Sequence, residues 1–159
     1  MNIAVRGIGI ISALGNGAGK PMPPLRPGRT GNELLGIPAR ETPSRTALLG
    51  MIAAAQAVAD AAIPAAARVA LVSGTSVGGM DLTENFYRDF RSDNGRGRLR
   101  SVAGHDCADS TRRIAEYCGI TGYTATVSTA CSSAAMEIAF CNASWAVTAN
   151  LSILISYSS

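Results

Sequence analysis

The chain is poor in aromatic side chains. Phenylalanine, tryptophan and tyrosine make up 5% of its 159 residues, whereas 17 residues are glycine. A core built on large rings is therefore excluded, and the abundance of small residues favours helices packed closely on a sheet. A strong charge is also lacking, because the formal net charge at pH 7 is only +3. So small a charge argues against a nucleic-acid partner and is compatible with an acidic protein partner.

Paired cysteines and recognisable sorting signals are absent as well. No Cys-x-x-Cys spacing occurs among the four cysteines, which are Cys107, Cys118, Cys131 and Cys141. This pattern predicts free thiols in a reduced, cytoplasmic protein. We expect no signal peptide, since Met1 leads almost directly into strand-like sequence.

Metal and nucleotide motifs are incomplete. The single histidine, His105, has no cluster of further ligands, so we expect no metal site and interpret it as a hydrogen-bonded core residue. The segment Gly7–Ser12 lacks the third glycine of a dinucleotide fingerprint. In Gly15–Pro21 a proline stands where a phosphate loop needs a hydroxyl. The sequence therefore predicts no bound cofactor.

Charged residues are missing after Glu137. An uncharged stretch can indicate a membrane span, but polar residues such as Asn142 and Asn150 make this one too hydrophilic. We predict instead a buried helix followed by a strand over Leu151–Ile155, and no membrane partner.

Strand and helix patterns alternate along the chain, which predicts an α/β fold with a largely parallel sheet. The apolar run Ile3–Ser12 predicts a buried strand, and the glycines and prolines of Gly15–Gly31 predict a loop. Further strands are predicted over Val69–Ser73 and Tyr123–Thr129. Helices are predicted from Ser44 to Pro64, over Asp81–Phe90, and over Ser101–Cys118 with Gly119 as its stop.

The most informative segment is Thr126–Ala134, with the sequence TVSTACSSA. It places Cys131 at a turn between a strand and a helix, where the sulfur is exposed and the first free N–H groups of the helix point at it. These groups and the helix dipole favour the thiolate that a nucleophile needs at neutral pH. A buried, unreactive Cys131 in a small-residue core is the alternative, and the residues alone leave both open.

The segment STACSSA resembles the active-site signature of β-ketoacyl synthases, the condensing enzymes of fatty-acid and polyketide synthesis. Similar blocks follow in the family's order up to about Ala135; they are Ile3–Gly17, Leu25–Gly31, Ser44–Gly50, Val72–Met80 and Val102–His105. The resemblance implies a thiolase-like α/β fold, of which this chain would be the N-terminal half of the layered αβαβα architecture. The sequence Thr-Ala-Cys-Ser-Ser is more similar to the synthases than to the thiolases that share the fold.

The resemblance also implies roles for individual residues. Cys131 would be the nucleophile that takes an acyl group from acyl carrier protein as a thioester, before decarboxylative condensation with malonyl carrier protein. Its backbone N–H would be an oxyanion donor, and Ala130, Ser132 and Ser133 would shape the turn.

Two kinds of protein contact follow from the same resemblance. A homodimer would pair the strand Tyr123–Ser128 with its copy. The acidic carrier protein would meet Arg45 or Arg40.

Three departures from the family qualify this expectation. The chain is about half the family's length, so the two histidines, the lysine and the second oxyanion donor of the C-terminal half are missing. The segments that meet at Gly31 and Asn32 are separated by a longer stretch of sequence in the family. Residues 136–159 depart from its pattern, as a frameshift or truncation would produce. We therefore expect residues 1–159 to be a truncated N-terminal domain.

Two functions remain open from the sequence. One is an acyltransferase that is incomplete as this chain, and the other is a non-catalytic remnant that acts as a binding or dimerising module. In either case half of a layered fold exposes the face meant for the other half, so we expect an exposed apolar patch and self-association or poor solubility.

Overall fold

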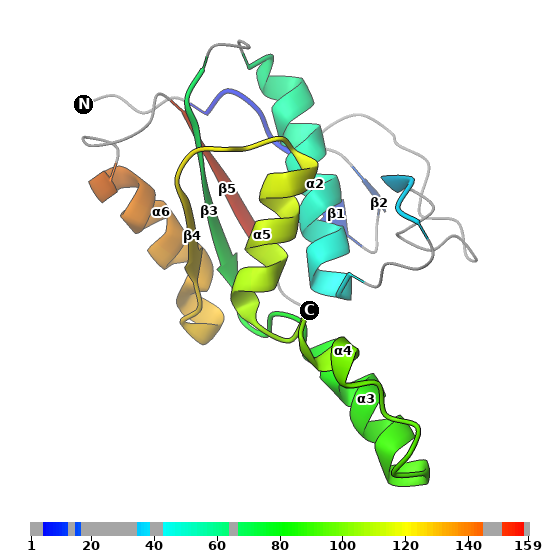
Figure 1. The fold of residues 1–159 in the computed structure, drawn as a ribbon. Coiled ribbons are helices and arrows are strands. Elements are labelled where there is room, and N and C mark those ends of the chain that lie inside the picture. Colours follow the sequence, from blue (N-terminus) through cyan, green and yellow to red (C-terminus); the bar gives the residue numbers. More distant parts are fainter. Residues whose placement is uncertain are drawn as a thin grey trace.

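The computed structural model describes residues 5–12, 15–16, 35–38, 43–63, 67–144 and 151–157. Its centre is a three-stranded sheet in the order β4-β3-β5 (Figure 1). Strand β3 (Val69–Thr75) is parallel both to β4 (Thr124–Val127) and to β5 (Leu151–Tyr157). The expected α/β fold with a parallel sheet is confirmed, as is the strand predicted over Leu151–Ile155.

Helices lie on both faces of this sheet. Helices α2 (Arg45–Ala61) and α5 (Cys107–Tyr117) pack on one face, and α6 (Ser133–Ser144) packs against the other (Figure 1). The side chains of β3 alternate between the two faces, as a strand requires. Leu71 therefore packs with α2 and α5, whereas Gly74 faces α6.

The core between the sheet and the first pair of helices is built from small and aliphatic residues. Its buried members are Ala47, Met51, Ala54, Leu71, Ile114 and Ala115. None of them is aromatic, so the packing expected from the composition is confirmed.

Helix α2 begins where its sequence predicts. The Ser44 hydroxyl accepts a hydrogen bond of 3.1 Å from the backbone N–H of Ala47, which satisfies one of the free donors of the first turn. The helix ends at Ala61, before Pro64, and the predicted boundaries are confirmed.

The single helix predicted over Ser101–Cys118 is wrong in its first part. A short helix, α4 (Leu99–Val102), ends before Gly104, and α5 starts afresh at Cys107. The break has a local cause, because the Asp106 carboxylate caps the new helix by accepting from the backbone N–H of Ala108. The predicted stop is confirmed, since Gly119 adopts a φ of +67° that glycine tolerates best.

The buried strand predicted over Ile3–Ser12 is also wrong. Residues 5–10 lie outside the three-stranded sheet, and β1 (Ile11–Ser12) pairs only with β2 (Gly15–Asn16), in antiparallel fashion. Val5 is 79% exposed. The backbone N–H groups of Ile8 and Ile10 donate to side chains of α2, and both edges of β3 are paired, with β4 and with β5. Most of the predicted loop Gly15–Gly31 lies outside the described residues.

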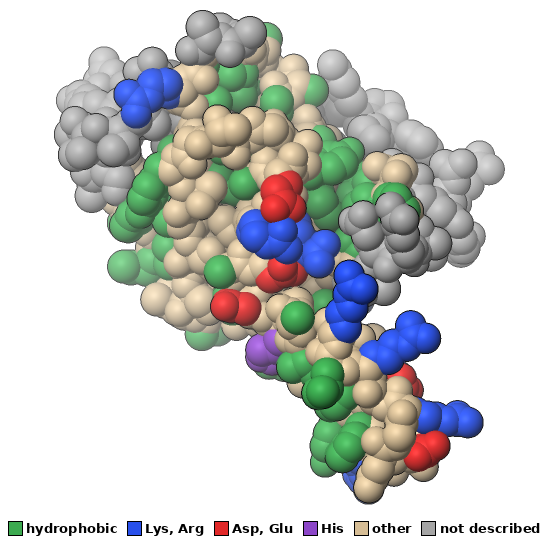
Figure 2. All heavy atoms as spheres, viewed as in Figure 1, with side chains coloured by type: hydrophobic (Ala, Val, Ile, Leu, Met, Phe, Trp, Pro, Cys, Tyr) green, Lys and Arg blue, Asp and Glu red, His purple; other side chains and the backbone are tan. Residues whose placement is uncertain are grey.

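A helical hairpin extends from this body, and we call its residues 80–102 the arm. It consists of α3 (Met80–Ser92) and α4, and it stands away from the sheet (Figures 1 and 2). The helix predicted over Asp81–Phe90 is confirmed. No residue of the arm is buried.

The outer side of α6 is unusually apolar for a surface. Ser133, Glu137 and Cys141 face inward, while Met136 and Ile138 are 49% and 55% exposed. The buried helix predicted after Glu137 is therefore wrong within the described residues, whereas an exposed apolar patch was expected. No helix in the described part of the chain is long and apolar enough to cross a membrane.

Candidate active site

Cys131 lies in a short 3₁₀ turn, η1 (Ala130–Ser132), between the end of β4 and the start of α6. Its side chain is exposed. This is the expected junction of a strand and a helix, and the exposure excludes the alternative of a buried thiol. The role of Cys131 as a nucleophile stays a prediction at this point.

The backbone of the turn is strained directly before the cysteine. Ala130 adopts a φ of +53°, a left-handed conformation that a residue with a Cβ avoids. Such a conformation costs about 1–2 kcal/mol in a non-glycine residue. It persists only where the surrounding structure holds it, and residues of this kind cluster at functional sites.

The contacts that hold the turn come from the end of β3 and from the start of α6. The Ser76 hydroxyl donates a hydrogen bond of 3.1 Å to the carbonyl oxygen of Ala130. The buried hydroxyl of Ser133 lies 2.7 Å from the same oxygen and 3.2 Å from the carbonyl oxygen of Thr75. Because β3 and β4 are parallel, their carboxyl ends meet at one edge, where α/β proteins place their sites.

Residues on either side of Cys131 form hydrogen bonds with one another within the turn. The Ser132 hydroxyl donates to the carbonyl oxygen of Thr129 over 2.8 Å, and the N–H of Thr129 donates to the Ser133 hydroxyl over 3.0 Å. The side chains of Ser132 and Ser133 are thus engaged within the turn. The turn-shaping roles expected for Ala130, Ser132 and Ser133 stay a prediction.

Two residues beside the turn escaped the sequence interpretation. Glu137 is 1% exposed, and a Cβ on Gly74 would lie 2.5 Å from its Oε2 atom, so the carboxylate packs directly on β3. Its spacing of four residues from Ser133 puts both on the inner side of α6 and was the available signal. Cys107, at the start of α5, donates its thiol to the Ser128 hydroxyl over 3.7 Å.

The sole histidine takes no part in this turn. The ring nitrogen Nδ1 of His105 lies 2.8 Å from the hydroxyl of Thr83 on α3, and the residue is exposed. The expected hydrogen bond is confirmed, but the expected core position is wrong. His105 instead joins the arm to the loop before α5.

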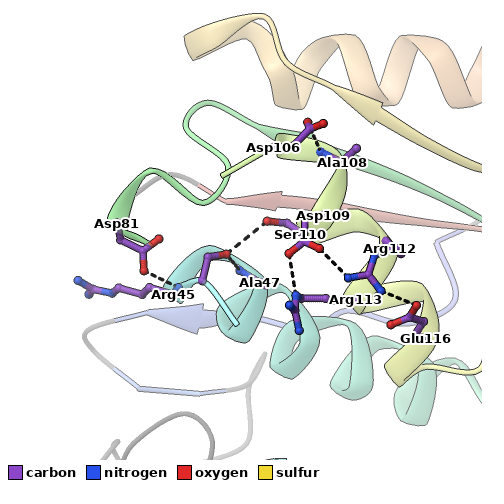
Figure 3. Close-up of polar contacts among 11 residues, drawn as sticks. Arg45, Ala47, Asp81, Asp106, Ala108, Asp109, Ser110, Arg112, Arg113 and Glu116 are labelled. Carbon is purple, nitrogen blue, oxygen red and sulfur yellow. Dashed lines mark hydrogen bonds and ion pairs between the residues drawn. The ribbon is translucent and has the colours of Figure 1, made fainter. Parts of the chain in front are cut away.

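Only one of the two arginines expected to contact the carrier protein lies within the described residues. Arg45 is exposed at the start of α2, and its backbone N–H donates to Asp81 over 2.9 Å (Figure 3). Arg40 lies outside the described residues. Within those residues no group of three metal-binding side chains comes together.

The charged side chains of α5 form a separate network (Figure 3). The Asp109 carboxylate pairs with Arg112 at 2.6 Å and with Arg113 at 2.7 Å, and Arg112 also reaches Glu116. Burial raises the pKa of Asp109, but the hydrogen bonds and charges of Arg113 and Arg112 outweigh it and leave that pKa lowered. Burial raises the pKa of the Cys118 thiol at the end of the same helix.

Comparison with solved structures identifies a similar fold. A β-ketoacyl synthase from Burkholderia phymatum matches with a TM-score of 0.55 and 19% sequence identity, over 69% of this chain and 29% of that protein. The chain thus spans less than a third of the length of that synthase. No curated protein matches it in sequence.

A family model gives the assignment. The N-terminal domain of β-ketoacyl synthases matches residues 25–144, which contain the whole turn around Cys131 and extend beyond Ala135. The fold is accordingly the N-terminal half of the thiolase-like architecture. By this match over most of its length, the chain belongs to the β-ketoacyl synthase family of condensing enzymes.

Proposed function

We propose that Cys131 accepts an acyl group from a thioester donor, which is the first half of the condensing reaction. The sulfur of Cys131 attacks the carbonyl carbon of the donor, and a tetrahedral oxyanion forms. Its collapse breaks the donor's carbon–sulfur bond, so the acyl group remains on Cys131 and the donor thiol leaves with a proton. The observation that carries the proposal is the exposed cysteine in a strained turn at the start of α6.

The backbone around Cys131 supplies the means to stabilise the oxyanion. Helix α6 follows the turn at once, so the positive end of its dipole lies beside the reacting atoms. The N–H of Cys131 is the donor we assign to the oxyanion. Ser76 and Ser133 fix the turn beforehand, which removes the need to reorganise it during the reaction.

The donor we propose is an acyl carrier protein, whose acidic surface would meet exposed arginines such as Arg45. We also propose a homodimer in which β4 pairs with the β4 strand of a second copy. In the described sheet β4 is an outer strand, so its free edge is available to the β4 strand of a second copy.

We further propose that this chain does not carry out the condensation step. Decarboxylation of the malonyl donor needs groups that polarise its carbonyl, and the only histidine of the sequence is bonded to Thr83 rather than placed at Cys131. The expected result is acyl transfer to Cys131 without release of carbon dioxide from malonyl carrier protein. Turnover of the malonyl donor by the isolated chain would contradict this restriction.

A second function is favoured by a different observation. The outer side of α6 is apolar, with Met136, Ile138 and Phe140 all exposed. Such a face is typical of a surface that another protein layer covers. A chain that only binds or dimerises would use this face and would leave Cys131 unmodified.

Intact mass after incubation with an acyl-carrier-protein or acyl-coenzyme A donor separates the two functions. The acyltransferase predicts a mass increase equal to one acyl group, which is absent in Cys131→Ala and retained in the control Cys107→Ala. Cleavage of the adduct by hydroxylamine would identify it as a thioester. No adduct, with the Cys131 thiol still free by titration, would overturn acyl transfer and leave the binding function.

A further inference from the structure

The carbonyl oxygen of Ala130 accepts hydrogen bonds from two different parts of the chain. The hydroxyl of Ser133, at the start of α6, lies 2.7 Å from it and belongs to the segment that follows the turn. The hydroxyl of Ser76 donates to it over 3.1 Å and comes from the segment directly after β3. Ser76 therefore connects the turn to a strand that is distant in the sequence.

This carbonyl oxygen shares a peptide group with the N–H of Cys131. A peptide group is planar, and in the trans form its C=O and N–H point in opposite directions. No cis peptide bond occurs in the described part of the chain. A bond that fixes the direction of the Ala130 carbonyl therefore also fixes the direction of the Cys131 N–H, which is the donor assigned above to the oxyanion.

The conformation of Ala130 favours rotation of this peptide group. Its φ of +53° lies in the left-handed region, which residues with a Cβ avoid. A return to the right-handed or extended region would turn the peptide group and move the N–H of Cys131. Such a movement would break the hydrogen bond from Ser76, so this bond opposes it.

The backbone on either side of Ser76 is itself held in place. Before it, Thr75 is fully buried at the end of β3, and its hydroxyl accepts a hydrogen bond of 3.1 Å from the N–H of Gly78. After it, the N–H of Gly79 donates to the carbonyl oxygen of His105 over 3.0 Å. Ser76 is exposed, so its side chain contributes little to packing, and its described contact is the bond to the turn.

We propose that Ser76 is a positioning residue for acyl transfer. Its hydroxyl holds the peptide group between Ala130 and Cys131, so that the N–H of Cys131 points at the oxyanion as it forms. This inference rests on the acyl transfer to Cys131 proposed above. It implies that Ser76 matters only in reactions where a carbonyl group becomes an oxyanion.

Two reagents that modify Cys131 separate this role from a general loss of structure. With p-nitrophenyl acetate the sulfur attacks the ester carbonyl, an oxyanion forms, and its collapse breaks the carbon–oxygen bond. The acetyl group stays on Cys131, p-nitrophenolate leaves, and the thiol proton passes to water. Iodoacetamide alkylates the same sulfur by displacement of iodide from a saturated carbon, which forms no oxyanion.

The expected result is a selective loss in Ser76→Ala. Acetylation of Cys131 should slow about tenfold, because a misdirected donor stabilises the oxyanion less. Alkylation of Cys131 should change by less than about twofold, since it does not use that donor. Peptide mapping assigns each modification to Cys131, and circular dichroism compares the helix content of the variants.

Three further variants sharpen the test. Ser92→Ala is the matched control, because it removes another exposed serine hydroxyl that donates to a backbone carbonyl, that of Asp89, over 2.7 Å on the arm; both rates should stay unchanged. Ser76→Thr keeps the hydroxyl and should retain most of the acetylation rate. Ala130→Gly removes the cost of the left-handed conformation, so in that background Ser76→Ala should slow acetylation only about threefold or less.

Several results would overturn the role of Ser76. They are a loss of acetylation in Ser76→Ala no larger than in Ser92→Ala, an equal loss of acetylation and alkylation, a Ser76→Thr variant as slow as Ser76→Ala, and a tenfold effect that persists with Ala130→Gly. Failure of the proposed function is a different result. It would be acetylation that depends on Ser76, without any adduct from acyl-carrier-protein or acyl-coenzyme A donors.

Discussion

The two sides of the central sheet differ in how their helices meet solvent. On the α2 and α5 side the outward residues of α5 are charged and paired, with Asp109 held between Arg112 and Arg113. On the α6 side the outward residues are apolar, and Ile138 is 55% exposed. The first side has the composition of a protein surface, whereas the second has that of an interior.

This comparison predicts that shortening a core side chain on the α2 and α5 side of the sheet has the largest effect on stability. Leu71 is fully buried between β3 and the helices α2 and α5, so Leu71→Ala should leave a cavity and cost about 3 kcal/mol of unfolding free energy. Urea unfolding followed by circular dichroism measures it. Leu99→Ala, at a side chain that is 76% exposed, should change stability by less than about 0.5 kcal/mol. Similar losses for both variants would show that β3 is not packed as described.

The contact between β3 and α6 predicts the next largest effect. An added methyl group in Gly74→Ala would lie 2.5 Å from the Glu137 carboxylate and 3.0 Å from the carbonyl oxygen of Ser133. Overpacking of this kind costs about 1–3 kcal/mol and should displace α6, together with the turn around Cys131.

Gly95→Ala is the matched control for that substitution. Its new methyl group would meet only the Asp93 carboxylate, at 3.5 Å, which is an ordinary contact. A stability for Gly74→Ala equal to that of Gly95→Ala would contradict the close packing of α6 on the sheet.

The ion pairs of α5 predict a smaller, pH-dependent effect. The pKa of Asp109 is lowered below 3.8 in the folded state, so the carboxylate contributes stability above that value and loses it as the pH falls through its folded pKa. Asp109→Asn should therefore cost about 1 kcal/mol near pH 7, and the difference from the unaltered chain should shrink below pH 4. A difference that stays constant from pH 7 to pH 2 would rule out the charge as its source.

The exposed side of α6 predicts the smallest effect on stability. Ile138→Lys should change the unfolding free energy by less than about 0.5 kcal/mol, because the side chain is already more than half exposed. It should nevertheless raise solubility and reduce the binding of a hydrophobic dye. A large loss of stability would mean that Ile138 is covered within the chain.

Local signals explain which elements the sequence predicts well. The Ser44 cap fixes the start of α2, the positive φ at Gly119 ends α5, and the apolar run Val69–Ser73 gives β3. Each signal acts through its nearest neighbours in the chain. The junction of strand and helix at Cys131 follows in the same way from a β-branched strand that ends in small residues, whereas the residues alone left the exposure of its sulfur open.

The predictions that are wrong concern packing between segments that lie far apart in the sequence. The run Ile3–Ser12 is as apolar as a buried strand, but both edges of β3 are paired, with β4 and with β5, which are distant from it in the sequence. Likewise the apolar composition of α6 indicates burial, while nothing in the sequence shows how much of the fold covers it. Ser76 escaped detection because its approach to the turn depends on the parallel pairing of β3 and β4.

The central claim is that the chain presents Cys131 as its accessible thiol. Brief treatment with iodoacetamide near neutral pH, followed by peptide mapping, measures the reaction rate of each cysteine in the folded chain. We expect Cys131 to react first, Cys118 more slowly because burial raises its pKa, and Cys141, at 8% exposure, slowest. Modification of Cys131 no faster than that of Cys141 would contradict the exposed turn and the acyl transfer proposed for it.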